Sequence, residues 1–149
     1  MRKKGKGKRK KEKRKNVVEV KFSKRINGVS ASWTRKIIFE TLLTEKVSNF
    51  TVSVYVTDNR EIRRLNKTHL RHDYATDVIS FKLEENLADI VVSFEKAKEM
   101  ALELGIPFKE ELARYLVHGT LHALGYRDKN KADYKRMVKR QESVLKQAL

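Results

Sequence analysis

The sequence has 149 residues, no cysteine and a formal net charge of +16. A chain of this length can build one domain around a single substantial core, and the lack of cysteine excludes a disulfide framework and a thiolate metal site. No apolar run approaches the length of a membrane span, and the N-terminal segment has no apolar stretch typical of a secretion signal. We therefore expect a cytoplasmic protein without a membrane partner.

Most of the positive charge lies at the N-terminus. Residues 1–15 contain eleven Lys or Arg and one acid, Glu12, which is +10 of the total +16. A lysine-rich run without apolar side chains after Met1 cannot bury a core, so we predict a disordered basic tail over residues 1–15 and one folded domain over 16–149. Cationic side chains in such a tail bind phosphate groups without reading sequence, which favours RNA or DNA as the partner.

The periodicity of apolar residues predicts alternating strands and helices in the first half of the domain. Strands are indicated where apolar and polar residues alternate, and helices where apolar residues recur every three or four positions. In chain order we expect a strand over 17–22, a helix over 30–46, a strand over 50–56, a short helix after Asp58 and a polar loop over 67–76.

The second half begins with two strands and continues with three helices. The strands are joined by Glu84-Glu85-Asn86, a connection so short that they should form an antiparallel hairpin. In the last helix we expect Tyr134, Met137 and Val144 to face inward. The predicted elements are strands over 77–83 and 87–93 and helices over 93–104, 108–124 and 132–148. This pattern indicates an α+β fold, with a small mixed sheet packed with several helices, the central one carrying a histidine pair.

The histidine pair is the strongest sign of chemistry in this chain. His118 and His122 are four residues apart, so a helix places both imidazoles on one face, close enough to share a metal ion. Gly125 can end that helix in a left-handed turn, which would bring the Asp128 carboxylate to the same ion. Three protein ligands leave zinc an open position for water, the arrangement of a catalytic site. We interpret the segment as the centre of a metal-dependent hydrolase, the alternative being that the histidines only pack in the core.

The same spacing occurs in metallopeptidases, where a glutamate follows the first histidine and acts as general base. Here that position is Gly119, which cannot accept a proton. Peptide hydrolysis by this motif is therefore disfavoured, while hydrolysis of another substrate class stays open.

Three sequence blocks, in this order, resemble the YbeY family of metal-dependent endoribonucleases. The blocks are Leu65-Asn66 with His72-Asp-Tyr-Ala-Thr-Asp-Val-Ile-Ser-Phe81, then Asp89-Ile-Val-Val-Ser93, then His118-Gly-Thr-Leu-His-Ala-Leu-Gly-Tyr126. The resemblance covers about residue 50 to the C-terminus. It implies a compact α+β fold, a zinc ion on the central helix and no nucleotide cofactor. It also implies cleavage of single-stranded RNA in ribosomal RNA maturation, at the 3′ end of the small-subunit RNA, and in ribosome quality control, with the ribosome or its small subunit as partner.

The chain departs from the family pattern at several site positions. Asp128 stands where the family has a third histidine ligand, and Leu70 stands where it has an arginine, with Arg71 one position further along. Ala75 replaces a proline and Ala88 a glycine. We assign His118, His122 and Asp128 as zinc ligands, and Arg71 and His118 as the catalytic candidates. An arginine can hold a phosphate by two parallel hydrogen bonds.

Other residues near these motifs have two possible roles each. His69 and His72 could exchange protons or could be loop residues. Asp77 and Asp89 could orient a ligand histidine or satisfy backbone groups. Tyr126 could stack on a base or pack beside the glycine turn. The rival functions are a non-catalytic RNA-binding assembly factor with a structural metal and, more remotely, a metallopeptidase.

Overall fold

The computed structural model describes residues 15–149, so all but the last residue of the predicted tail lies outside the described residues. The elements are β1 (Val17–Phe22), α2 (Ala31–Thr44), β2 (Thr51–Thr57), α3 (Asn59–Leu70), β3 (Val78–Glu84), β4 (Leu87–Ser93), α4 (Phe94–Leu104), α5 (Phe108–Ala123) and α6 (Lys131–Ala148). Within residues 15–149 no helix is both long and apolar enough to cross a membrane.

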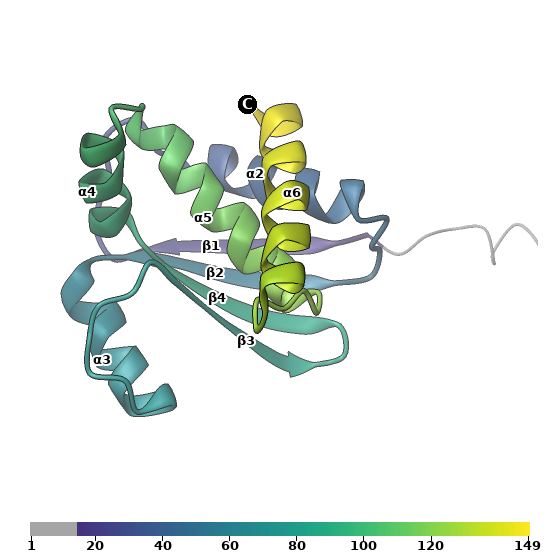
Figure 1. Cartoon of the computed structure of the whole chain (residues 1–149), viewed down its shortest axis with the longest axis horizontal. Coiled ribbons are helices and arrows are strands. Elements are labelled where there is room, and N and C mark those ends of the chain that lie inside the picture. Colours follow the sequence, from purple (N-terminus) through teal and green to yellow (C-terminus); the bar gives the residue numbers. More distant parts are fainter. Residues whose placement is uncertain (1–14) are drawn as a thin grey trace, which may run out of the picture.

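The four strands form one mixed sheet in the order β1-β2-β4-β3. β1, β2 and β4 run parallel, and β3 runs antiparallel to β4, which confirms the predicted hairpin. Figure 1 shows α2, α4, α5 and α6 on one side of the sheet and α3 on the other. The α+β class with a mixed sheet is therefore as predicted from the sequence.

Helix α5 occupies the centre of the fold, as its apolar sequence predicts. It contacts β3 and β4 on one side and α2, α4 and α6 on the others. Leu112, Leu116 and Leu121 are fully buried along it. A helix enclosed in this way is held by packing over most of its surface, which fixes the position of the polar side chains that it carries.

Two details of the predicted elements are wrong. Helix α3 continues to Leu70, where a polar loop was expected from residue 67 onward. It buries only Ile62 and Asn66, so its polar composition reflects a solvated helix surface and not a loop. Tyr134, expected to face inward, is 55% exposed, because the first turn of α6 is largely exposed and its buried residues begin at Met137.

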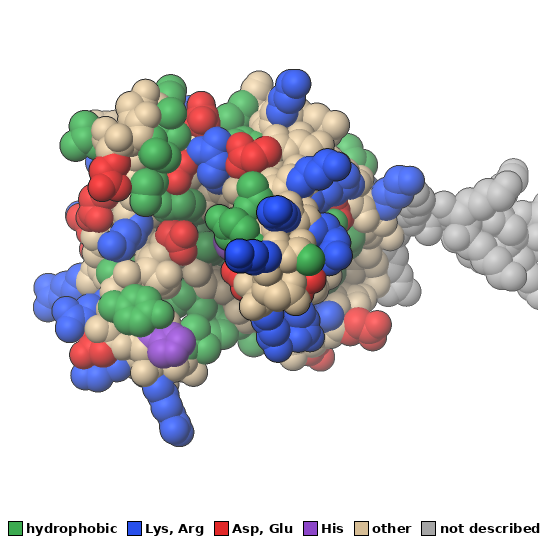
Figure 2. Space-filling view, in the orientation of Figure 1, with side chains coloured by type: hydrophobic (Ala, Val, Ile, Leu, Met, Phe, Trp, Pro, Cys, Tyr) green, Lys and Arg blue, Asp and Glu red, His purple; other side chains and the backbone are tan. Residues whose placement is uncertain are grey.

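The charges of the folded domain are dispersed. In the face seen in Figure 2, Lys and Arg side chains are scattered over the surface with acidic side chains between them. Several of these charges are paired, as in the ion pairs of Arg64 with Glu61 and of Arg114 with Glu110. The largest concentration of positive charge in the sequence is therefore the N-terminal segment.

Candidate metal centre

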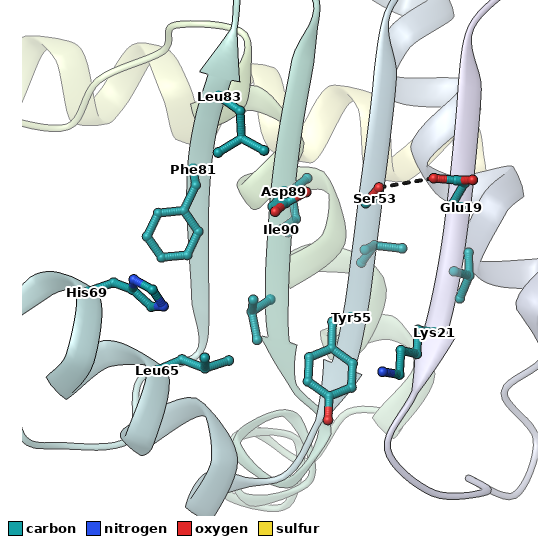
Figure 3. A pocket seen from close by; sticks show the side chains of 13 residues that line it. Glu19, Lys21, Ser53, Tyr55, Leu65, His69, Phe81, Leu83, Asp89 and Ile90 are labelled. Carbon is teal, nitrogen blue, oxygen red and sulfur yellow. Dashed lines mark hydrogen bonds between the residues drawn. The ribbon is translucent and has the colours of Figure 1, made fainter.

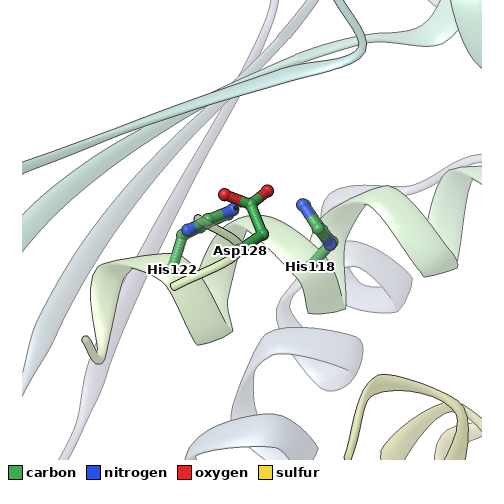
Figure 4. A group of neighbouring side chains, drawn as sticks. All are labelled: His118, His122 and Asp128. Carbon is green, nitrogen blue, oxygen red and sulfur yellow. Dashed lines mark ion pairs between the residues drawn. The ribbon is translucent and has the colours of Figure 1, made fainter. Parts of the chain in front are cut away.

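The three predicted ligands lie together at the C-terminal end of α5 (Figure 4). Donor atoms of His118, His122 and Asp128 all lie within 4.8 Å of one another. His122 Nε2 is 3.5 Å from Asp128 Oδ2, and the two imidazole rings are nearly perpendicular, with centroids 4.7 Å apart. Donor atoms about 2.0–2.2 Å from one zinc ion are about 3.4 Å apart around a tetrahedron, so the spacing of His122 and Asp128 suits such an ion.

A glycine turn brings Asp128 back to the helix. Gly125 has a positive φ of 106°, which favours glycine, and its N–H donates to the carbonyl of His122 at 3.0 Å. The N–H of Tyr126 then donates to Leu121 O at 3.1 Å. The Tyr126 hydroxyl donates to Glu45 at the end of α2, at 2.8 Å, so this tyrosine anchors the turn.

Helix α6 orients His118, a contact that the sequence motifs did not indicate. The buried side chain of Gln141 places Oε1 at 2.7 Å from His118 Nδ1, while its Nε2 donates to Glu142 at 3.0 Å. Because the amide nitrogen is used by the Glu142 carboxylate, the amide oxygen faces the ring and Nδ1 must be the donor. The Nε2 lone pair of His118 is thus left for a metal.

The backbone orients His122 in the same way. Its Nδ1 lies 3.0 Å from the carbonyl oxygen of Tyr126, so Nδ1 carries the proton and Nε2, the atom nearest Asp128, has the free lone pair. Both histidines are therefore held in the tautomer that a metal requires. Two imidazoles and one carboxylate form a donor set that fits zinc.

The protonation of His118 also suits a metal ligand. Burial lowers the pKa of this imidazole below its ordinary value, although its hydrogen bond with Gln141 opposes the shift. Burial disfavours the charged imidazolium, so His118 is neutral at neutral pH. A neutral imidazole can offer its lone pair to a cation without first losing a proton.

The surroundings of Gly119 leave no space for the glutamate that acts as general base in the metallopeptidases. A Cβ atom at this position would lie 2.7 Å from Val78 Cγ2 and 2.9 Å from Ile90 Cγ2, closer than real Cβ contacts. The Ser80 hydroxyl also donates to the Gly119 carbonyl at 2.7 Å. Here α5 lies directly against the sheet, so a glutamate side chain has no room and could not reach the metal ligands.

A polar cleft of about 340 Å³ opens beside His122. Its walls come from α3, the segment after it, β3 and α5, and include Leu70, His72, Ser80 and Lys82. Among the described residues, the end of α3 contributes Leu70 and the segment after it contributes His72 to the lining, but Arg71 between them is not part of it. Arg71 is the exposed C-cap of α3, in the left-handed conformation with φ 60°.

Several polar residues beside this cleft hold the segment between α3 and β3 in place. Asn66 is buried and donates to the Tyr74 carbonyl at 2.9 Å, and Arg63 pairs with Asp73 at 2.9 Å. Asp77 accepts from the N–H of Val78 at 2.7 Å, which is the backbone role considered for it. These contacts fix the segment between α3 and β3, which forms one wall of the cleft.

Tyr126, His72 and His69, the other residues with two possible roles, lie at three different places. Tyr126 packs against the core beside the glycine turn. His72 lines the cleft and stacks on Tyr74, with ring centroids 5.5 Å apart. His69 instead lines a hollow on the other face of the sheet, together with Asp89.

Comparison with known proteins shows the family of this chain. A sequence model described as "Endoribonuclease YbeY" matches residues 12–149. The chain is 34% identical over 131 residues to "Endoribonuclease YbeY" of Flavobacterium psychrophilum, which covers 86% of this chain and 91% of that protein. It is 45% identical over 86 residues to the protein of that name from Aquifex aeolicus, covering 54% of this chain and 57% of that protein.

The fold is also found in a solved structure. The solution structure of TM1509 from Thermotoga maritima superposes with a TM-score of 0.66 over 89% of each chain, at 24% sequence identity. The likeness to TM1509 shows a shared fold. Since the family model spans all of the described residues and the Flavobacterium relative is matched along most of its length, this chain belongs to the endoribonuclease YbeY family.

Proposed function

We propose that this protein is a zinc-dependent endoribonuclease that cleaves single-stranded RNA in ribosomal RNA maturation, at the 3′ end of the small-subunit RNA, and in ribosome quality control. The observation that carries the proposal is the convergence of His118, His122 and Asp128 beside a polar cleft, in a chain whose relatives are named as endoribonucleases. The domain would span residues 16–149, with the basic tail before it, and would work in the cytoplasm on the ribosome or its small subunit.

Each site residue has a defined part in this proposal. His118, His122 and Asp128 would hold the zinc ion, with Gln141 and the Tyr126 carbonyl keeping the imidazoles in the required tautomer. When bound, zinc would polarise a phosphate oxygen or bring the pKa of a bound water toward about 7. Arg71, as the catalytic cation, would approach a phosphate bound in the cleft from the end of α3, between Leu70 and His72.

The test is digestion of a single-stranded oligoribonucleotide by the full-length chain. We expect internal cleavage that a chelator abolishes and that added zinc restores, together with about one zinc per chain by metal analysis. A double-stranded RNA of the same sequence should resist cleavage. His118→Ala is the matched variant, since it removes one ligand, and it should lose both zinc and cleavage.

Two results would support the rival functions instead. RNA binding with bound zinc but no cleavage would indicate an assembly factor with a structural metal, a function favoured by the apolar Leu70 in the cleft lining. Digestion of casein but not RNA would indicate a metallopeptidase.

A further inference from the structure

A wide hollow of the described chain lies away from the metal ligands, on the sheet face opposite α5 (Figure 3). This groove has a volume of about 580 Å³ and is bounded by the sheet and by Leu65 and His69 of α3. Its other walls include the rings of Tyr55 and Phe81. The groove is mostly apolar, so it favours an occupant that offers apolar surface.

A row of four side chains crosses the floor of the groove. Strand register places Glu19 beside Ser53, Ser53 beside Asp89, and Asp89 beside Phe81. The Ser53 hydroxyl donates to Glu19 at 3.3 Å, which leaves the central carboxylate of Asp89 without a side-chain hydrogen-bond partner among the residues that the structure describes. Asp89 is half-buried and lies beside the Phe81 ring, so its carboxylate is free to accept hydrogen bonds from N–H groups of a ligand.

The aromatic rings suit a stacked ring system. The Phe81 ring meets the His69 imidazole edge to face at 5.5 Å, and the Tyr55 ring has Lys21 Nζ 5.4 Å from its centroid. The Phe81 and Tyr55 rings are both half-buried at the sheet surface. Aromatic rings on a pleated sheet are a common platform for unpaired bases, because every base has an apolar face that stacks.

The distribution of charge favours a base over a phosphate inside the groove. Glu19 and Asp89 on the floor would repel a phosphate, whereas Lys21 lines the groove and Lys82, one residue after Phe81, lines the neighbouring cleft. A nucleotide fits this pattern when its base enters the groove and its phosphate stays outside near these cations.

The groove and the polar cleft beside His122, which is called the metal cleft below, are both bounded by β3 and α3. On β3, Phe81 faces the groove while Ser80 and Lys82 line the cleft, and on α3, His69 lines the groove while Leu70 lines the cleft. Because β3 is the edge strand, no further strand of the described sheet separates the two hollows. An RNA strand that reached both hollows would therefore pass around the edge of β3.

We propose that this groove binds an unpaired nucleobase with an exocyclic amino group, taken from the RNA strand held at the metal centre, by stacking on Phe81 and by donation to Asp89. This inference rests on the proposed function. Cytosine, adenine and guanine each have amino hydrogens that a carboxylate accepts. Uracil has a single N–H between two carbonyl oxygens, which the carboxylate repels, so the groove disfavours uracil.

The first experiment measures binding by the metal-free, full-length chain in chelator, so that no cleavage interferes. Fluorescence anisotropy compares oligocytidine with oligouridine of equal length. We expect the parent to prefer oligocytidine, and Phe81→Leu to weaken its binding about tenfold through loss of stacking. Asp89→Asn should reduce the ratio of the two affinities. The ratio is the readout because removing a negative charge strengthens the binding of any RNA.

Matched controls lie outside the groove. Tyr134→Leu removes an exposed ring on α6, and Glu103→Gln neutralises an exposed carboxylate on α4. Both should bind like the parent. Phe81→Tyr keeps the ring and should retain affinity, which separates stacking from folding, and thermal unfolding by circular dichroism checks each variant.

Photo-cross-linking gives a second, mutation-free readout. An oligomer that contains 5-iodocytidine should cross-link to the peptides of Tyr55 or Phe81. Cross-links found only elsewhere, or unchanged affinity in Phe81→Leu with an unchanged ratio in Asp89→Asn, would overturn the inference and leave the groove to a protein partner. Base-selective binding without cleavage would refute the proposed function alone. Cleavage without any effect of the groove variants would refute this inference alone.

Discussion

Asp128 is the most exposed of the three candidate ligands and the one whose residue type is least expected. Its side chain is 45% exposed, whereas His118 and His122 are each held by a hydrogen bond to a second group. An aspartate shortly before a helix can also serve as its cap. The N-cap of α6 is instead Asn130, which accepts from the Asp133 N–H at 2.8 Å, so capping does not require Asp128.

Because Asp128 does not cap α6, substitutions of Asp128 test metal binding without removing the helix cap. We expect Asp128→Ala to lose zinc and cleavage with little change in the free energy of unfolding of the metal-free domain. Asp128→His should restore both, because imidazole is an equally good zinc ligand, and Asp128→Asn should not, because a neutral amide is a weak donor. Zinc content and chemical denaturation measure the two effects.

The matched control is Asn130→Ala in the same loop. It removes the helix cap, so it should cost about 1 kcal/mol of stability while keeping zinc. Full zinc occupancy at parental affinity in Asp128→Ala would remove Asp128 from the proposed site.

Arg71 and Lys82 are two cations that could stabilise charge on a phosphate in the cleft. Arg71 lies in the turn after α3, and Lys82 lines the cleft itself. If Arg71 acts in the transition state, Arg71→Ala should lower the cleavage rate about a hundredfold and leave RNA affinity nearly unchanged. Single-turnover cleavage and anisotropy separate these quantities. A parental rate in Arg71→Ala, with the loss found in Lys82→Ala, would transfer the role to Lys82.

At the scale of elements, the close contact of α5 with the sheet sets the position of both histidines. Gly119 lies between them and permits that contact. Alanine is the better helix former by about 1 kcal/mol, yet a methyl group here would overlap Val78 and Ile90. We expect Gly119→Ala to lower the free energy of unfolding by about 1–3 kcal/mol, as overpacking does. Denaturant unfolding of the metal-free domain measures it.

A second substitution tests the cause of this loss. Val78→Ala removes one of the two methyl groups that a Cβ at Gly119 would meet. Combined with Gly119→Ala, it should cost less than the sum of the single changes, since the two sites are in direct contact. Strict additivity, or a stability of Gly119→Ala equal to the parent, would show that the helix and sheet can separate at little cost.

The sequence predicted those features that depend on local spacing. The ligands lie within eleven residues of one helix and its turn, so periodicity and Gly125 sufficed to bring them together. Gln141 is 23 residues from His118, and its contact arises only when α6 packs on α5, for which the sequence has no local signal. The expectation of a loop from residue 67 onward was wrong because the last turn of α3, residues 67–70, is exposed and mostly polar, so the apolar spacing of Ile62 and Leu65 does not continue through it.

At the scale of the whole molecule, the metal cleft and the base groove are built from the same pair of elements. Alternate residues of β3 face opposite sides of the sheet, which is why one strand can line two hollows. The sheet is covered by helices on one face, while α3 bounds the groove on the other. The open face is therefore available to a ligand without any change in the core.

The N-terminal segment should add affinity for RNA without choosing where it is cut. Residues 1–15 carry +10 of the net charge of +16, whereas the proposed metal ligands and Arg71 lie beyond residue 70. Each Lys or Arg that meets a phosphate of single-stranded RNA releases counterions and adds about 0.7 to the slope of log affinity against log salt. Deleting residues 2–15 should flatten this slope, measured by anisotropy from low to high salt, and leave the cleavage positions unchanged.

A tail of equal length with glutamine at every Lys and Arg is the control, and it should behave like the deletion because charge and not length is responsible. A slope equal to that of the parent would show that the segment does not touch RNA.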